Sequence, residues 1–313
     1  MRPKDVNLSK ALEAALVSFA SKRRSLPGIT NDARREAFVE QIVESIRRIK
    51  YVSVIREQTL SASRADPSSE MFDPIKAAIL QMRQGRTDEA FWLVFLSVHF
   101  GKHRRSGWRL VRDVYGRLGR QPIWDWTQIS TDPNVFRQWL QREKGRLRSD
   151  GVPRHFGNHR KYQSLDARTP TGTGAAFETY VAWVGPPRTH EMAFDEAFRI
   201  SGRNPKATFD YLYKSMRAVA SFGRTARFDY LTMIGKVGLA PIEPGSTYLE
   251  GATGPLLGAR LLFGGRTRAA IGRSSLDKSL IELGAELGVG MQVLEDALCN
   301  WQKSPGRFSR FRG

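Results

Sequence analysis

The chain has 313 residues, of which 41% are hydrophobic, enough to bury the core of one large domain or two modest ones. Its 50 lysines and arginines against 31 aspartates and glutamates give a formal net charge of +19, which is typical of proteins that bind a polyanion. No apolar run is long enough to span a bilayer, and the single cysteine, Cys299, excludes an intrachain disulfide and a cysteine-rich metal or iron–sulfur site.

The beginning of the chain is predicted to be helical. Residues 1–4 lead into a polar, amphipathic stretch, so no signal peptide is expected. Apolar residues recur at helical spacing over residues 8–19 and again over 38–49. Residues 61–74 are polar and contain two prolines, which indicates a loop. We therefore predict an N-terminal helical segment over residues 1–70 and a helical body over 71–313.

The middle of the chain combines helical stretches with three aromatic and basic blocks. Helical spacing returns after Ile75, over 89–98 and after Pro205, and few apolar runs have period two, so the fold is predicted to be mostly helical. Each block contains a Phe-Gly pair followed by basic residues. The blocks cover residues 99–105, 154–162 and 222–230.

The first block contains His99, Lys102 and His103. His99 and His103 have the i, i+4 spacing that can place two zinc ligands on one helix face. No third ligand is evident, and Gly101 weakens a helix between them. We therefore expect no metal here and interpret the three side chains as phosphate or DNA contacts.

The second and third blocks carry the side chains that best suit an anionic substrate. Arginine and lysine bind phosphate oxygens, and asparagine and neutral histidine exchange hydrogen bonds or accept a proton. The alternative is plain contact with the DNA backbone, with Asp229 pairing with the arginines of its own block. The candidate residues are Asn158, His159, Arg160, Lys161, Arg224 and Arg227.

The last quarter of the chain combines a glycine turn with a single carboxylate. In residues 245–263, Gly251 and Gly254 precede an apolar helix with Ala259 near its start, so backbone N–H groups could approach a phosphate there. Asp277 then stands at the mouth of another amphipathic helix. The alternative is a glycine-rich loop followed by a helix that Ser275 or Asp277 caps. The tail, residues 303–313, is basic and aromatic, and is expected to be loose and to touch DNA.

Together these two segments resemble the helix-hairpin-helix DNA glycosylase superfamily. Its hairpin glycines and following helix correspond to Leu249, Gly251, Gly254 and Ala259, with one extra residue between the glycines, and its catalytic segment corresponds to Leu276-Asp277 and Leu287-Gly288. The resemblance implies an all-α, glycosylase-like fold whose hairpin binds the DNA backbone and whose catalytic residue is Asp277. Leu256 and Leu257 stand where lyase-type members carry a lysine, which disfavours a combined glycosylase and lyase.

A narrower resemblance covers roughly residues 75 to 290. The second and third blocks and the Gly254-Pro255 pair are similar to the alpha-glutamyl/putrescinyl thymine pyrophosphorylase family, which includes bacteriophage amino acid:DNA transferases. It implies a transferase that acts on double-stranded DNA after a kinase has phosphorylated or pyrophosphorylated 5-hydroxymethyluracil. An amino acid or polyamine would displace the phosphate from a flipped-out base. No cofactor is implied, and the expected location is the cytoplasm, that of the host if the protein is phage-encoded.

The expected chemistry needs cations for the departing phosphate and a proton acceptor for the attacking amine. The arginines and Lys161 suit the first need, and Asp277 or a neutral histidine suits the second. Two other functions remain open at this point. One is a monofunctional DNA glycosylase in which Asp277 stabilises positive charge on the sugar. The other is a non-enzymatic, basic DNA-binding protein.

Overall fold

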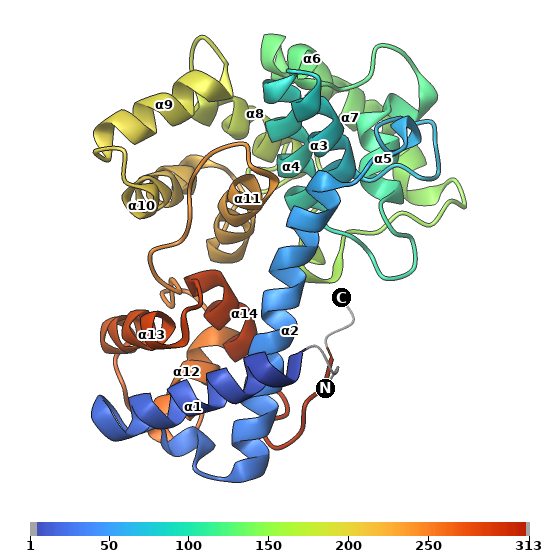
Figure 1. Cartoon of the computed structure of the whole chain (residues 1–313). Coiled ribbons are helices and arrows are strands. Elements are labelled where there is room, and N and C mark those ends of the chain that lie inside the picture. Colours follow the sequence, from blue (N-terminus) through green and yellow to red (C-terminus); the bar gives the residue numbers. More distant parts are fainter. Residues whose placement is uncertain (1–4, 311–313) are drawn as a thin grey trace. The chain divides into compact units, whose positions relative to one another are not determined.

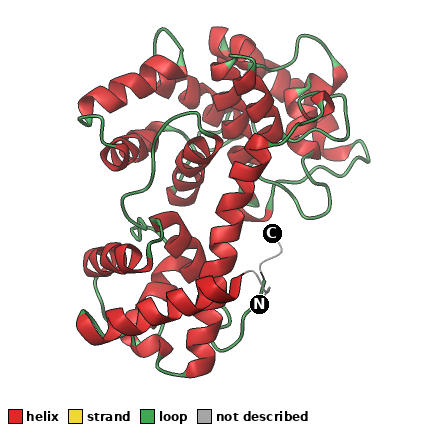
Figure 2. Cartoon of the chain, viewed as in Figure 1, coloured by secondary structure: helices red, strands yellow, loops and turns green. Residues whose placement is uncertain are grey.

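The computed structural model describes residues 5–310, and within that range it contains α-helices, short 3₁₀ turns and no strand (Figure 2). The predicted all-α class is confirmed. None of the helices in this range combines the length and the apolar character needed to cross a bilayer. The helices are α1 (Val6–Lys22), α2 (Asp32–Glu57), α3 (Pro74–Arg83), α4 (Thr87–Phe100), α5 (Arg109–Tyr115), α6 (Trp126–Thr131), α7 (Pro133–Ser149), α8 (Thr173–Val184), α9 (His190–Ile200), α10 (Pro205–Ser215), α11 (Arg224–Val237), α12 (Gly254–Gly264), α13 (Arg273–Leu287) and α14 (Met291–Trp301).

The helices form two compact units, and the first unit is discontinuous in sequence. Unit 1 joins residues 1–53 to residues 244–312, whereas unit 2 is residues 54–243. Figure 1 shows α12, α13 and α14 gathered with α1 and the first part of α2. This division differs from the predicted boundary between residues 70 and 71. The reason is long-range packing: α1 contacts α13, so the N-terminal helices share a core with the C-terminal ones.

The core of unit 1 is mainly aliphatic. α1 contributes Leu12 and Leu16, and leucines of α12, α13 and α14 pack in the same cluster. Burial of aliphatic surface contributes about 25 cal/mol per Å². Phe38 and Trp301 add a tilted ring pair, with centroids 4.8 Å apart. Unit 1 therefore has a nonpolar interior to which its polar loops are attached.

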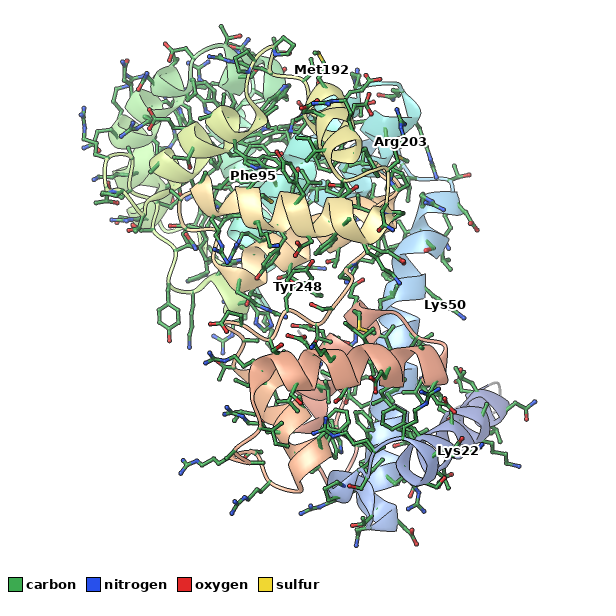
Figure 3. All side chains as sticks on the ribbon, turned by 90° about the vertical axis from the view of Figure 1, so that its left-hand side faces the viewer. Lys22, Lys50, Phe95, Met192, Arg203 and Tyr248 are labelled. Carbon is green, nitrogen blue, oxygen red and sulfur yellow. The ribbon has the colours of Figure 1, made fainter. Side chains whose placement is uncertain are left out.

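The core of unit 2 is aromatic and surrounds α4. Every residue of α4 from Ala90 to Phe100 is buried, so the helix is apolar on all sides and occupies the centre of its unit. Phe95 stacks on Tyr180 with ring centroids 3.9 Å apart and on Phe222 at 4.8 Å. Figure 3 shows Phe95 within the helical body, whereas Met192 lies at its periphery.

Buried polar side chains form a chain of hydrogen bonds through this aromatic core. Asp88 pairs with Nδ1 of His190 at 2.7 Å, and Nε2 of His190 lies 2.8 Å from the Tyr180 hydroxyl. The Tyr180 hydroxyl in turn lies 2.7 Å from that of Tyr230. Burial lowers the pKa of His190, although Asp88 opposes the shift. Satisfied networks of this kind stabilise one arrangement of a core.

Three helices of unit 2 begin with the same local device, an Asp or Asn before a proline. The carboxylate of Asp73 accepts hydrogen bonds from the N–H groups of Ile75 and Lys76 at 3.1 Å, and Pro74 follows it. Asp132 starts α7 and Asn204 starts α10 in the same way. The side-chain oxygen satisfies N–H groups that the first helical turn leaves unpaired, and proline needs no such partner.

The C-terminal tail follows unit 1 as far as the structure describes it. Nε of Arg310 lies 3.4 Å from the carboxylate of Glu44, and the indole of Trp301 donates to the carbonyl of Pro305. The expectation of a loose tail is therefore not met up to Arg310, because these contacts attach it to α2 and α14. Residues 311–313 and the N-terminal residues 1–4 lie outside the described part of the chain.

Candidate functional site

The first two Phe-Gly blocks lie against each other in unit 2. The N–H of Gly157 donates to the carbonyl of Phe100 at 2.8 Å, and the rings of Phe100 and Phe156 stack. Gly101 has a φ of +66°, and a Cβ on Gly157 would lie 2.8 Å from its carbonyl carbon. Both glycines are needed because the two backbones approach too closely for side chains.

The third block contacts the second block through a hydrogen-bonded ion pair between Asp229 and Arg160. NH2 of Arg160 donates to Oδ2 of Asp229 at 2.9 Å, although the two residues are far apart in sequence. The side chain of Gln163 also donates to the carbonyl of Ser221 at 3.2 Å. The fold therefore brings together the three blocks that the sequence separates.

Arg160 is an internal anchor. It is 7% exposed, its Nε donates to the carbonyl of Val98 at 2.6 Å, and NH1 donates to that of His159 at 3.2 Å. With the bond to Asp229, the guanidinium is largely satisfied by the protein. Asp229 was expected to pair with the arginines of its own block, but it pairs with Arg160 because their side chains meet between η5 (Asn158–Arg160) and α11. The Asp229 carboxylate remains 45% exposed.

The exposed groups of the second block surround this anchor. His159 and Lys161 are both exposed. Nζ of Lys161 lies 5.0 Å above the ring of Tyr162, a cation–π contact on a side chain that is 89% exposed. The side chain of Asn158 lies outside the described part of the structure. His159 and Lys161 are therefore accessible to an anionic ligand.

Arg224 and Arg227 form a second cationic cluster, together with Arg217, which the sequence did not indicate. Both predicted arginines are 9% exposed. The guanidinium of Arg227 lies 4.3 Å above the ring of Tyr213, and its NH1 donates to the carbonyl of Tyr213 at 2.9 Å. Burial lowers the pKa of Arg227, and the positive charges of Arg217 and Arg224 lower it further. Three positive side chains therefore lie close enough to one another for their charges to interact.

The first block does not form a continuous helix face. α4 ends at Phe100, and His103 instead forms an isolated β-bridge with Gly107. His99 and His103 are therefore not on one helix face, because Gly101 turns the chain between them. In the described residues, no group of three or more histidine, cysteine, aspartate or glutamate side chains is placed to hold a metal.

The three candidates of the first block have different exposure. His99 is 1% exposed, and burial, with a smaller contribution from Arg160, lowers its pKa to about 3. Its Nε2 lies 3.0 Å from the hydroxyl of Thr173, so it is a neutral core residue without a surface to offer DNA. Nδ1 of His103 accepts a hydrogen bond from the N–H of Ser106 at 3.2 Å. Lys102 is exposed and can reach an anion.

In unit 1, the glycines of the turn serve helix packing as well as the access of a ligand to the backbone. Gly251 is exposed and has a φ of +72°, which favours glycine. Gly254 is the first residue of α12, and a Cβ there would lie 2.7 Å from Sγ of Cys299. Its lack of a side chain is therefore needed where α12 meets α14. Ala259 is fully buried and lies in the middle of α12, not near its start as predicted.

Asp277 lies inside α13 and ties the loop before α12 to that helix. α13 begins at Arg273 after Gly272, so Asp277 lies inside the helix and not at its mouth as predicted, and the alternative that Ser275 or Asp277 caps the helix is also contradicted. Oδ1 of Asp277 accepts a hydrogen bond from the Thr247 hydroxyl at 2.7 Å, and Oδ2 accepts one from the N–H of Leu249 at 3.3 Å. Each oxygen keeps a second lone pair for another donor.

Comparison with known protein families identifies the family of this chain. Residues 33–313 match the family described as alpha-glutamyl/putrescinyl thymine pyrophosphorylase clade 3. The chain belongs to this family. The matched range begins in α2 and includes every candidate residue from His99 to Asp277. No curated protein and no solved structure was found to match the chain.

Membership of the thymine pyrophosphorylase family identifies the chain as an enzyme of thymine modification. The resemblance predicted from the second and third blocks is therefore confirmed at the level of the family. The family name implies a DNA substrate that carries a modified thymine. A polyanionic substrate agrees with the formal net charge of +19.

Proposed function

We propose that the protein is a transferase that attaches an amine to the methylene group of phosphorylated or pyrophosphorylated 5-hydroxymethyluracil in double-stranded DNA. Membership of the thymine pyrophosphorylase family over residues 33–313 carries this proposal. The amine is an amino acid or a polyamine, and phosphate or pyrophosphate is released. The reaction follows that of a 5-hydroxymethyluracil DNA kinase, and we place it in the cytoplasm because the substrate is DNA.

In this reaction, a C–N bond forms at the methylene carbon while its C–O bond breaks. The electron pair of the C–O bond leaves with the phosphate oxygen, so negative charge grows on the leaving group. Positioned cations stabilise that charge in the transition state. We assign this role to Arg224 and Arg227, two cations that lie close enough to interact, and to Lys161, which is exposed.

The attacking amine must also lose a proton, because its ammonium form has no lone pair. We assign proton acceptance to Asp277, and we assign hydrogen bonding to the substrate to His159 and Asn158. The support for Asp277 is its fixed orientation: two neutral donors hold the carboxylate, and each oxygen can still accept a further proton or hydrogen bond. Arg160 acts indirectly, because it orients Asp229 and the η5 backbone.

DNA binding completes the proposal. In a helix-hairpin-helix arrangement, the turn at Gly251 and Gly254 would present backbone N–H groups to a phosphate at the start of α12. Residues 238–253 separate α11 from α12 and contain no helix, so this segment holds the turn with Gly251. Lys102 and His103 would contact the DNA backbone from unit 2.

The test is product analysis with defined DNA. The purified protein is incubated with kinase-treated 5-hydroxymethyluracil DNA and a panel of amines that includes glutamate and putrescine, and the digested nucleosides are analysed by mass spectrometry. A thymidine nucleoside carrying the amine supports the proposal, and untreated 5-hydroxymethyluracil DNA serves as the control. A released free base would instead indicate a monofunctional glycosylase. Absence of product with every donor, despite DNA binding, would indicate a non-enzymatic DNA-binding protein.

A further inference from the structure

We infer that a cavity of unit 2, beside the hairpin 102–108, is a binding site for a phosphate group. The cavity has a volume of about 300 Å³, near the lower end of the range for small-ligand sites. Five cationic and two carboxylate side chains line it. The cations are Arg64, Lys102, Arg105, Arg109 and Arg112. This inference does not depend on the transfer reaction, because it concerns binding alone.

Both carboxylates of the cavity are already engaged, and two of its five cations are paired, Arg109 with Glu70 and Arg112 with Asp113. Asp73 caps α3 with its Oδ1, which accepts two backbone hydrogen bonds at 3.1 Å. The Glu70 carboxylate is 81% exposed and lies 3.4 Å from NH2 of Arg109. Within residues 5–310, neither Lys102 nor Arg105 has an acidic partner at ion-pair distance. The charge of the cavity is therefore positive, and an anion would compensate it.

The hairpin that presents these cations is well defined. His103 and Gly107 exchange backbone hydrogen bonds of 3.0 and 2.9 Å, and Gly107 has a φ of +57°. Ser106 donates to Nδ1 of His103 within the turn. The hairpin is thus held closed by its own bonds, which fixes Lys102 at its start and Arg105 near its tip. A preorganised cation cluster loses less entropy when it binds a ligand.

One residue in the wall of the cavity also carries a side-chain N–H without a partner in the described residues. Nε1 of Trp108 is buried, and the described residues offer it no acceptor. Leaving a buried N–H unpaired is unfavourable, and an anionic oxygen is a strong acceptor. The indoles of Trp124 and Trp139 also lack acceptors, but both side chains are 2% exposed and belong to the aromatic core. Trp108 instead lines the cationic cavity.

The shared chemistry of the ligand is a phosphate with several charged oxygens. Its source is either a free anion, such as pyrophosphate, or a phosphate of the DNA backbone. Arginine favours such oxygens because its planar fork can donate two parallel hydrogen bonds. Pyrophosphate represents the free anion and a DNA duplex represents the backbone phosphate. Binding of each probe to the same set of variants therefore distinguishes the two sources.

The test uses the full chain, two probes and a matched pair of variants. Calorimetric titration measures the affinity for inorganic pyrophosphate and, separately, for a short unmodified DNA duplex at low salt. Arg105→Ala removes a cation of the cavity. Arg104→Ala removes its exposed neighbour, which does not line the cavity, and therefore serves as the control. We expect Arg105→Ala to lower the affinity for one of the probes about tenfold or more, and Arg104→Ala to change that affinity much less.

A second measurement follows the indole N–H signals of ¹⁵N-tryptophan-labelled protein by NMR. The Trp108 signal, assigned with Trp108→Phe, should shift when the probe binds. The Trp183 signal should not, because that indole already donates to Ser215. Response to pyrophosphate supports a free anion, and response to DNA alone supports a backbone phosphate. Equal affinities of both arginine variants for both probes, with an unmoved Trp108 signal, would overturn the inference. Because neither probe carries modified thymine, failure here leaves the transferase proposal untouched.

Discussion

In unit 1, both oxygens of Asp277 accept hydrogen bonds from neutral donors, Thr247 and Leu249, whereas in unit 2 Asp229 is held by the guanidinium of Arg160. Within residues 5–310, no cation lies at ion-pair distance from Asp277. A carboxylate held by neutral donors keeps its full charge for a proton or a developing cation, whereas one paired with arginine is compensated. This difference favours Asp277 as the reacting carboxylate and Asp229 as a positioning residue.

The largest expected effect tests that difference directly. Asp277→Asn should leave DNA binding intact and lower turnover by about 10²–10⁴-fold, the usual contribution of a positioned acid–base group. The fold should survive, since the amide oxygen can still accept from Leu249 and the amide nitrogen can donate to the Thr247 hydroxyl. Initial rates of nucleoside adduct formation give the turnover, and melting temperatures check the fold.

Asp229→Asn is the matched variant in unit 2. The new amide oxygen can still accept from Arg160, which also keeps its bonds to Val98 and His159. A half-exposed ion pair contributes at most about 1 kcal/mol, so turnover should fall by roughly fivefold or less. The reverse ranking, with a nearly active Asp277→Asn and an inactive Asp229→Asn, would move the proton acceptor to unit 2.

The two cores also differ in their buried titratable groups, and the stability of the protein at acidic pH should reveal this difference. Unit 1 has an aliphatic interior, whereas the aromatic core of unit 2 encloses His99 and His190. Burial lowers the pKa of His99 to about 3, below the value near 6.5 of an unfolded chain. The folded protein therefore binds fewer protons than the unfolded chain between these values. The stabilisation is complete above pH 6.5 and is lost as the pH falls toward 3.

The expected slope is a loss of about 1.4 kcal/mol of unfolding free energy per pH unit for each such histidine. Urea denaturation between pH 7 and pH 4 measures it. His99→Gln is the control: its amide can still donate to Thr173 but does not titrate. The variant should lose stability less steeply in acid. Parallel pH profiles for the two proteins would show that His99 is not the group responsible.

Local features of the fold were predictable from sequence, and contacts between distant segments were not. Helical spacing predicted the helices that begin at Pro74 and Pro205, because caps and apolar periodicity act over a few residues. The pairing of Arg160 with Asp229 spans 69 positions, and that of Asp277 with Thr247 spans 30, so no local pattern reports them. Arg217 joins its cluster only because η6 (Met216–Ala218) follows α10.

The three Phe-Gly blocks show which properties of a site a sequence motif can predict. The sequence indicated three basic blocks as candidates, and the fold assembles them in one unit. It also separates their members by exposure: Lys161 reaches solvent, whereas Arg160 and His99 are internal. Residue type alone cannot make that distinction, because burial depends on elements contributed by other segments.

The smallest expected effect concerns glycine, which unit 1 uses for close helix packing. A Cβ on Gly258 of α12 would overlap the carbonyl oxygen of Leu298 in α14, and neither backbone can move without shifting its helix. Gly258→Ala should therefore lower the free energy of unfolding by about 1–3 kcal/mol, as overpacked cores do. Gly145 in α7 of unit 2 faces open space, so Gly145→Ala should raise it by up to about 1 kcal/mol through helix propensity alone. Urea denaturation of both variants at neutral pH measures the difference. An unchanged stability of Gly258→Ala would mean that α12 and α14 can separate slightly at no cost, and that the aliphatic core of unit 1 is less tightly packed than its contacts indicate.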